Sequence, residues 1–141
     1  MSVKQISIFL ENKPGMLNQL TAELAKSGIN MRALSLAETK DFGIARIIAD
    51  DTLKAMTALK DGGFIASLTP VLAFEIPNEA GGLNGLLQTL TDAAVNIEYM
   101  YSCLSLRGNS RAVMIFRVAD TEASEAALQA KGLWSLSQDD I

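Results

Sequence analysis

The stretch that determines this fold reads Asn12-Lys13-Pro14-Gly15-Met16-Leu17-Asn18, and it returns later in the chain as Asn78-Glu79-Ala80-Gly81-Gly82-Leu83-Asn84. The match continues at the same offset, since Ile29-Asn30-Met31 corresponds to Val95-Asn96-Ile97. Positional agreement of this kind indicates an internal duplication rather than a shared composition. We therefore expect two related units, spanning residues 1–69 and 70–141.

The offset between the two copies changes in the middle of the repeat. It becomes larger where Ile48-Ala49-Asp50 matches Val118-Ala119-Asp120 and Gly62 matches Gly132. The extra residues fall near Arg107-Gly108-Asn109-Ser110, whose Gly-Asn pair is typical of a hairpin turn. Hairpin loops tolerate insertions better than strands do, so we predict a variable turn at this point of the second unit.

Both units show the same order of predicted elements. Alternating apolar residues predict a first strand in each copy, through Ile6, Ile8 and Leu10 or through Leu72, Phe74 and Ile76. Leucines at helical spacing predict a helix that opens at Gly15 or Gly82. A hairpin of two strands follows, at residues 31–38 and 43–49 or 97–106 and 112–118. A second helix and a short last strand, near residues 64–68 or 133–136, complete each copy.

The order βαββαβ predicts an α+β fold of two ferredoxin-like units. Each unit is expected to form an antiparallel sheet with both helices on one face. We expect Phe9, Ala45 and Ile47 on the face that the helices leave uncovered. A unit of about 70 residues buries a smaller share of its surface than a larger domain does. The halves are therefore expected to rely on each other or on a second copy of the chain, as in a homodimer.

Composition excludes several kinds of partner. The chain has 12 Lys and Arg against 16 Asp and Glu, a net charge of −4, without the basic clusters that a nucleic-acid surface needs. Its uncharged segments are too short to cross a bilayer. The first residues run directly into a predicted strand and leave no room for a signal peptide. We expect a cytoplasmic protein that binds neither nucleic acid nor membrane.

The residue types also argue against catalysis. Histidine is absent, which removes the commonest general base near neutral pH and the usual zinc ligand sets. Cys103 is the single cysteine, so an intrachain disulfide and Cys-rich metal sites are excluded. Lys13 is the only basic side chain in the repeated turn, and nothing beside it resembles an activating base. We expect no enzyme activity, no cofactor and no metal.

The strand-to-helix turn Glu11-Asn12-Lys13-Pro14-Gly15-Met16-Leu17 resembles the signature of the ACT domain, the amino-acid-sensing module. The second turn, Pro77-Asn78-Glu79-Ala80-Gly81-Gly82-Leu83, resembles the same signature, with Ala80 where the family usually has proline. The family's other mark is an asparagine that opens the second strand, matched by Asn30 and Asn96. The two copies cover nearly the whole chain, which therefore resembles a tandem ACT protein. The resemblance implies that a ligand lies between the turn of one unit and the second-strand asparagine of a paired unit.

The chemistry of the turn agrees with that expectation. Unpaired N–H groups at a helix start, together with the helix dipole, form a site suited to a carboxylate. The asparagine carboxamide offers a donor and an acceptor, which suits an α-amino group. The predicted ligand-binding residues are Asn12, Lys13, Pro14, Gly15, Met16, Leu17, Asn30 and Met31 in the first repeat, and Asn78, Gly81, Gly82, Leu83, Asn96 and Ile97 in the second.

Two readings of function remain open from the sequence. The first is a non-catalytic sensor that binds a free amino acid at ACT–ACT interfaces and acts on an enzyme partner in trans. The second is a ligand-free structural module that binds a partner protein through a sheet edge or a helix face. Lys13-Pro14 is basic and rigid, whereas Glu79-Ala80 is acidic and looser. Because Glu79 would repel a carboxylate, we expect the first turn to form the stronger site.

Overall fold

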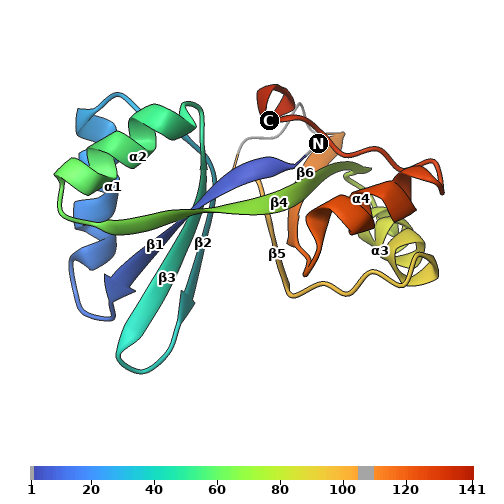
Figure 1. Ribbon diagram of the computed structural model, residues 1–141, viewed down its shortest axis with the longest axis horizontal. Coiled ribbons are helices and arrows are strands. Elements are labelled where there is room, and N and C mark those ends of the chain that lie inside the picture. The colour runs from blue at the N-terminus through green and yellow to red at the C-terminus, as the bar shows by residue number, and fades with distance from the viewer. Residues whose placement is uncertain (1, 105–109) are drawn as a thin grey trace. The chain divides into compact units, whose positions relative to one another are not determined.

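The computed structural model describes residues 2–104 and 110–141, and it divides into two compact units (Figure 1). The first unit is Lys4–Thr69, and the second is Pro70–Ile141 together with the N-terminal residues up to Val3. The predicted hairpin turn at Gly108-Asn109 lies outside the described residues. Each unit is described in turn.

The first unit contains six elements in the predicted order. They are β1 (Val3–Glu11), α1 (Met16–Lys26), β2 (Met31–Glu38), β3 (Phe42–Ala49), α2 (Thr52–Asp61) and the first part of β4 (Ile65–Pro77). Its strands lie in the order β2-β3-β1-β4, and β3 pairs antiparallel with both β1 and β2. A hydrogen bond of 2.9 Å joins the hydroxyl groups of Ser7 on β1 and Thr69 on β4. The antiparallel sheet that the sequence predicts is therefore confirmed.

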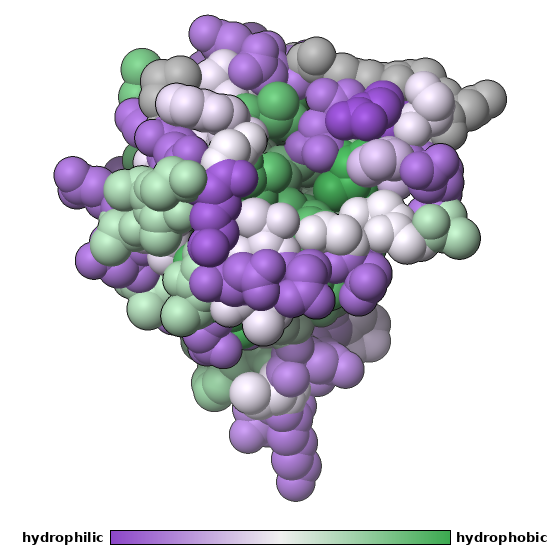
Figure 2. All heavy atoms as spheres, turned by 90° about the vertical axis from the view of Figure 1, so that its right-hand side faces the viewer, coloured by the Kyte–Doolittle hydropathy of each residue, from purple (hydrophilic) through white to green (hydrophobic). Residues whose placement is uncertain are grey.

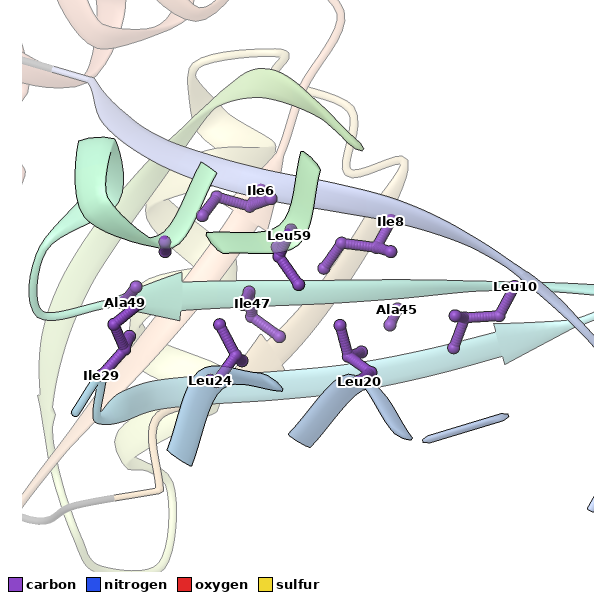
Figure 3. Packing of buried hydrophobic residues seen from close by; sticks show 11 residues of the cluster. Ile6, Ile8, Leu10, Leu20, Leu24, Ile29, Ala45, Ile47, Ala49 and Leu59 are labelled. Atoms are coloured by element: carbon purple, nitrogen blue, oxygen red, sulfur yellow. The ribbon is translucent and has the colours of Figure 1, made fainter. Parts of the chain in front are cut away.

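The core of the first unit lies between its sheet and the two helices. Side chains of β1 and β3 point toward leucines of α1 and α2 (Figure 3), and the cluster includes Ile6, Ile8, Leu10, Leu20, Leu24, Ala45, Ile47 and Leu59. The placement of Ala45 and Ile47 on the uncovered face was wrong. They pair with Ile8 and Ile6 across the ladder, and directly opposed residues share a face of the sheet. Phe9 does lie on the other face, where Ile44 opposes it.

The second unit repeats the arrangement with shorter strands. It contains the second part of β4, then α3 (Gly82–Asp92), β5 (Tyr99–Ser102), β6 (Arg111–Arg117), α4 (Thr121–Gln129) and the 3₁₀ helix η1 (Gln138–Asp140). The strand order is β4-β6-β5, with antiparallel pairs. Both helices contribute to one core, which consists of Leu72, Phe74, Ile76, Leu86, Leu90, Phe116, Val118 and Leu128.

Three elements differ from the sequence predictions. The last strand of the first unit and the first strand of the second form one strand, β4, which runs through Pro70 without a break. β5 begins at Tyr99 rather than Ile97. Residues 133–136 form no strand, although a hydrogen bond of 2.8 Å from the Leu136 N–H to the Ala73 carbonyl joins this segment to β4.

The structure also corrects the alignment of the two repeats after the hairpin. Ile6 opposes Ile47, and Leu72, the counterpart of Ile6, opposes Phe116. Phe116 is therefore the counterpart of Ile47, and the offset in this part is 116 minus 47, or 69. That is one position shorter than the offset that matched Ile48 with Val118. The residues that cap α2 and α4, Asp51 and Asp120, show the same shorter offset. Gly132 is therefore the counterpart of Gly63, not of Gly62, and both have positive φ angles, 82° and 84°.

Candidate functional site

The two repeated turns end in the same backbone geometry. Gly15 precedes α1 with φ 87° and ψ −10°, and Gly81 precedes α3 with φ 85° and ψ −7°. These left-handed conformations favour glycine strongly over other residues. A Cβ atom added at either position would have no atom within 4 Å. The space next to each helix start is therefore open.

The first turns of α1 and α3 carry N–H groups that donate to no atom of the described residues. Met16 N–H donates to the Lys13 carbonyl at 3.4 Å, and Gln19 N–H donates to the Gly15 carbonyl at 2.9 Å. Between them, the N–H groups of Leu17 and Asn18 have no acceptor among the described residues. Neither helix has a side-chain cap at its N-terminus. These donors can bind an anion without displacing a hydrogen bond of the protein.

The second repeat shows the same pattern. Gly82 N–H donates to the Glu79 carbonyl and Gly85 N–H to the Gly81 carbonyl, at 3.0 and 2.9 Å. The N–H groups of Leu83 and Asn84 have no acceptor within the described part of the chain. The two turns are therefore equivalent in sequence and also in the backbone N–H groups that they leave without an acceptor.

Asn12 has a structural function at the turn. Its side-chain amide donates to the carbonyl oxygens of Thr39 and Lys40, both at 3.2 Å, and its backbone N–H donates to the Asp41 carbonyl at 2.9 Å. These bonds tie the turn to the hairpin between β2 and β3. In the second unit, Asn78 N–H donates to the Ser110 carbonyl at 2.9 Å.

The remaining residues of the predicted turns differ in what they expose. Lys13 forms an ion pair of 3.3 Å with Glu11, and both side chains are more than half exposed. Pro14 is exposed next to it. By contrast, several apolar side chains pack partly against the core of their own unit and offer a ligand mainly their backbone: Met16, Leu17 and Met31 in the first unit, and Leu83 and Ile97 in the second.

The two second-strand asparagines are exposed. Asn30 closes the corner between β2 and β3 through its backbone, because its N–H donates to the Asp50 carboxylate at 3.1 Å and its carbonyl accepts the Asp50 N–H at 3.0 Å. Its carboxamide has no partner among the described residues, and neither does that of Asn96. Both carboxamides are available to a ligand.

A single unit does not bring its turn and its asparagine together. Glu11, at the start of the turn, opposes Phe42, whereas Met31, next to Asn30, opposes Ala49 at the other end of β3. At about 3.3 Å per strand residue these ends are roughly 20 Å apart. One small ligand therefore contacts both groups only if they come from different repeats.

A cavity of about 380 Å³ lies beside the second turn, and the sequence did not predict most of its lining. One face of α3 contributes to it, at the spacing 82, 85, 86 and 89 that is typical of neighbours on a helix. Figure 2 faces the second unit and shows hydrophobic atoms at the bottom of a hollow bordered by hydrophilic atoms. The residues that line the cavity are Glu75, Ile76, Pro77, Glu79, Ala80, Gly81, Gly82, Gly85, Leu86, Thr89 and Leu133.

Charge and reactivity limit what these sites can do. Glu75 in the cavity forms an ion pair with Arg111 at 3.1 Å, whereas Glu79 has no cationic partner among the described residues.

Burial raises the pKa of Cys103 to about 11, which keeps its thiol protonated near neutral pH. No group of three or more His, Cys, Asp or Glu residues that could hold a metal occurs in residues 2–104 and 110–141. No helix in that part of the chain is long and apolar enough to cross a membrane.

A βαββαβ unit and a second unit that repeats it without the last strand, each with both helices packed on one face of an antiparallel sheet, define a tandem ferredoxin-like protein. The chain belongs to a particular family within that class, because a model described as an ACT domain pair matches residues 1–141. The ACT domain pair is a regulatory module. The family resemblance and the fold that it implies are therefore confirmed.

Solved structures agree with this assignment. The chain is 41% identical to protein BT0572 from Bacteroides thetaiotaomicron, with a TM-score of 0.89 and coverage of 99% of this chain and 95% of that one. The ligand-free regulatory subunit of aspartate kinase from Thermus thermophilus is 21% identical, with a TM-score of 0.65 over 92% of this chain and 90% of that one. The corresponding subunit from Thermus flavus, also 21% identical, has a TM-score of 0.59, with 90% and 88% covered. At that identity the two kinase subunits show a common fold. The search of curated proteins gave no significant match.

Proposed function

We propose that this protein is a non-catalytic sensor that binds a free amino acid where the turn of one ACT repeat meets the second-strand asparagine of another. The observation that carries the proposal is the pair of unused N–H groups at Leu17 and Asn18, which recurs at Leu83 and Asn84. The repetition argues for a ligand because α2 and α4 have side-chain caps from Asp51 and Asp120, whereas α1 and α3 are both left uncapped.

The ligand's two backbone groups have separate partners in this proposal. The α-carboxylate accepts hydrogen bonds from Leu17 and Asn18 and is stabilised by the positive end of the α1 dipole. The α-amino group donates to the carboxamide oxygen of Asn30 or Asn96, which the described protein atoms leave unused. Because each repeat presents these groups about 20 Å apart, binding joins two repeats. A homodimer supplies such pairs.

We further propose that the first turn binds more strongly than the second. Lys13 is paired with Glu11 at 3.3 Å, so these two charges of the first turn balance, whereas Glu79 gives the second turn a negative charge beside its cavity. A carboxylate placed near Glu79 meets like-charge repulsion. The cavity of about 380 Å³ at the second turn is large enough for an amino-acid side chain.

The proposed output is regulation of an enzyme partner in trans, in the cytoplasm. A reducing compartment suits a chain whose only cysteine is a buried thiol. An effector shifts its partner only by the difference between its affinities for two arrangements of the protein. The absence of histidine and the high pKa of Cys103 both support a role without catalysis.

A panel of free amino acids tests the proposal by thermal unfolding. One of them should stabilise the protein by about 2.7 kcal/mol at a hundredfold excess over its dissociation constant. Gly15→Val should abolish this response. Gly63→Val is the matched control, because Gly63 has a similar φ angle of 84° and equally open surroundings but follows α2. An equal loss of response in both variants, or none in either, argues against a site at the turn.

The competing reading, a ligand-free interaction module, has one observation in its favour. Phe9 and Phe42 are 43% and 46% exposed on the sheet face of the first unit that is opposite its helices, and their ring centroids are 4.9 Å apart. Exposed aromatic residues of this kind mark protein contacts. A protein that no amino acid stabilises, but that loses self-association when Phe9 is changed to Ser, would favour this reading.

A further inference from the structure

Arg32 on β2, two residues after Asn30, is not part of the repeated motif. It is the extra residue of an irregularity in the ladder between β2 and β3, where the register shifts between Met31 and Ala33. Its Nε atom is shielded from solvent and has no hydrogen-bond partner among the described residues. A guanidinium that is partly buried without an acceptor loses its hydration and gains nothing in return.

The equivalent corner of the second repeat shows what Arg32 lacks. Ala33 opposes Ile48 in the first unit, and the equivalent Tyr99 opposes Arg117 in the second, so Glu98 is the counterpart of Arg32. Glu98 lies 4.0 Å from the guanidinium of Arg117, and its N–H donates to the Arg117 carbonyl at 2.9 Å. The charge at this position is thus paired in the second repeat.

In the first repeat the neighbour across the ladder cannot form such a pair. Ile48 occupies the place of Arg117, and its side chain is apolar and completely buried. The nearby Asp50 carboxylate already accepts the N–H of Asn30 at 3.1 Å. Among the described residues, no carboxylate lies within ion-pair distance of Arg32.

We infer that Arg32 binds the side-chain carboxylate of an acidic amino acid at the Asn30 corner. This inference rests on the proposed function, in which the turn N–H groups take the α-carboxylate and the Asn30 carboxamide takes the α-amino group. Arg32, two residues after Asn30, is then the partner for a third group. A guanidinium matches a carboxylate in a planar, bidentate arrangement. The second repeat, with Glu98 paired to Arg117, has no equivalent cation for such a ligand.

Isothermal titration calorimetry of the full chain tests this inference with two matched pairs of ligands. L-aspartate is compared with L-asparagine and L-glutamate with L-glutamine, because each pair differs in charge but hardly in shape. The wild type should bind one acid at least about tenfold more tightly than its amide. Arg32→Gln should remove that preference and leave the affinity for the amide within about twofold of the wild type. Lys60→Gln, which removes a positive charge from an exposed position at the end of α2, should keep the preference.

Three results would overturn the inference, and they can be told apart. Equal or tighter binding of the amides by the wild type excludes a side-chain carboxylate at Arg32 but leaves the proposed function standing. An Arg32→Gln variant that loses affinity for acid and amide by the same factor assigns Arg32 to the ligand backbone or to the fold. Binding of none of the four ligands overturns the inference, and the thermal-unfolding panel then decides whether the proposed function stands with another amino acid or falls as well.

Discussion

The side-chain amide of Asn12 lies 3.2 Å from the carbonyl oxygen of Lys40, so the first residue of the repeated turn is tied to the hairpin of the same unit. The same amide also reaches the carbonyl of Thr39. The motif asparagine thus ties the turn to the hairpin, while the donors proposed for the ligand are the N–H groups of Leu17 and Asn18.

Replacing Asn12 by Ala should therefore lower stability. Two side-chain hydrogen bonds are lost from an exposed site, which should reduce the free energy of unfolding by about 1 kcal/mol. Urea denaturation measures the change. Asn18→Ala is the control, since Asn18 is an exposed residue of α1 and should lose little or gain slightly. Equal effects of the two substitutions would mean that the Asn12 bonds contribute nothing.

The two glycines at positions 82 and 85 of α3 should respond in opposite ways to alanine. A Cβ atom on Gly82 would overlap the carbonyl oxygen of Pro77, whereas a Cβ atom on Gly85 has nothing within 4 Å. Gly82→Ala should destabilise the protein by about 2 kcal/mol or more, because the backbone must move. Gly85→Ala should stabilise it by up to about 1 kcal/mol through helix propensity. Similar melting temperatures for the two variants would contradict the close approach at Pro77.

Placing a single aspartate on one face of β3 or on the other should affect stability very differently. Ala45 is fully buried in the core, and its neighbour Ile44 is 39% exposed on the opposite face. Ala45→Asp should cost at least about 3 kcal/mol, because it buries an unpaired carboxylate. Ile44→Asp should leave a folded protein. Circular dichroism with urea titration compares them, and the reverse order would restore the face assignment first expected from the sequence.

Stability should fall with increasing pH because of Cys103. Burial raises the pKa of its thiol from 9.0 to about 11 in the folded state, so the unfolded state loses this proton first. Fewer protons on the unfolded chain mean that the free energy of unfolding decreases between about pH 9 and pH 11. Cys103→Ala should remove this part of the decrease. Thiol labelling near pH 8 should likewise be slow until denaturant is added, and rapid labelling of the folded protein would contradict the burial.

Much of the fold could be predicted because the sequence pattern reflects local physics. The alternation of Ile6, Ile8 and Leu10 and the leucines of α1 identify the faces that meet in the core. The parity of β3 could not be read, since Gly43 to Ala49 is apolar at nearly every position and pairing with β1 decides which side is buried. The same pairing was needed to see that the offset between the repeats after the hairpin is one position shorter than the sequence match indicates.

The candidate site was predictable only in part. Gly15 and Gly81 were found by their recurrence, and their positive φ angles explain why glycine stands there. Arg32 gave no signal, because an unpaired guanidinium is recognised only once the residue across the ladder is known to be Ile48. The cavity lining at Glu75 and Thr89 depends on which strand and helix face meet, and this too required coordinates.

The unbroken course of β4 through Pro70 has a practical consequence for anyone who edits this chain. Side chains on a strand alternate, so one residue inserted near Pro70 would rotate Leu72, Phe74 and Ile76 out of their core, while two inserted residues would return them to phase. Inserting an odd number of residues in this segment should unfold the second unit, whereas inserting an even number should leave it folded. The junction between the duplicated halves should therefore accept insertions and deletions only in multiples of two residues.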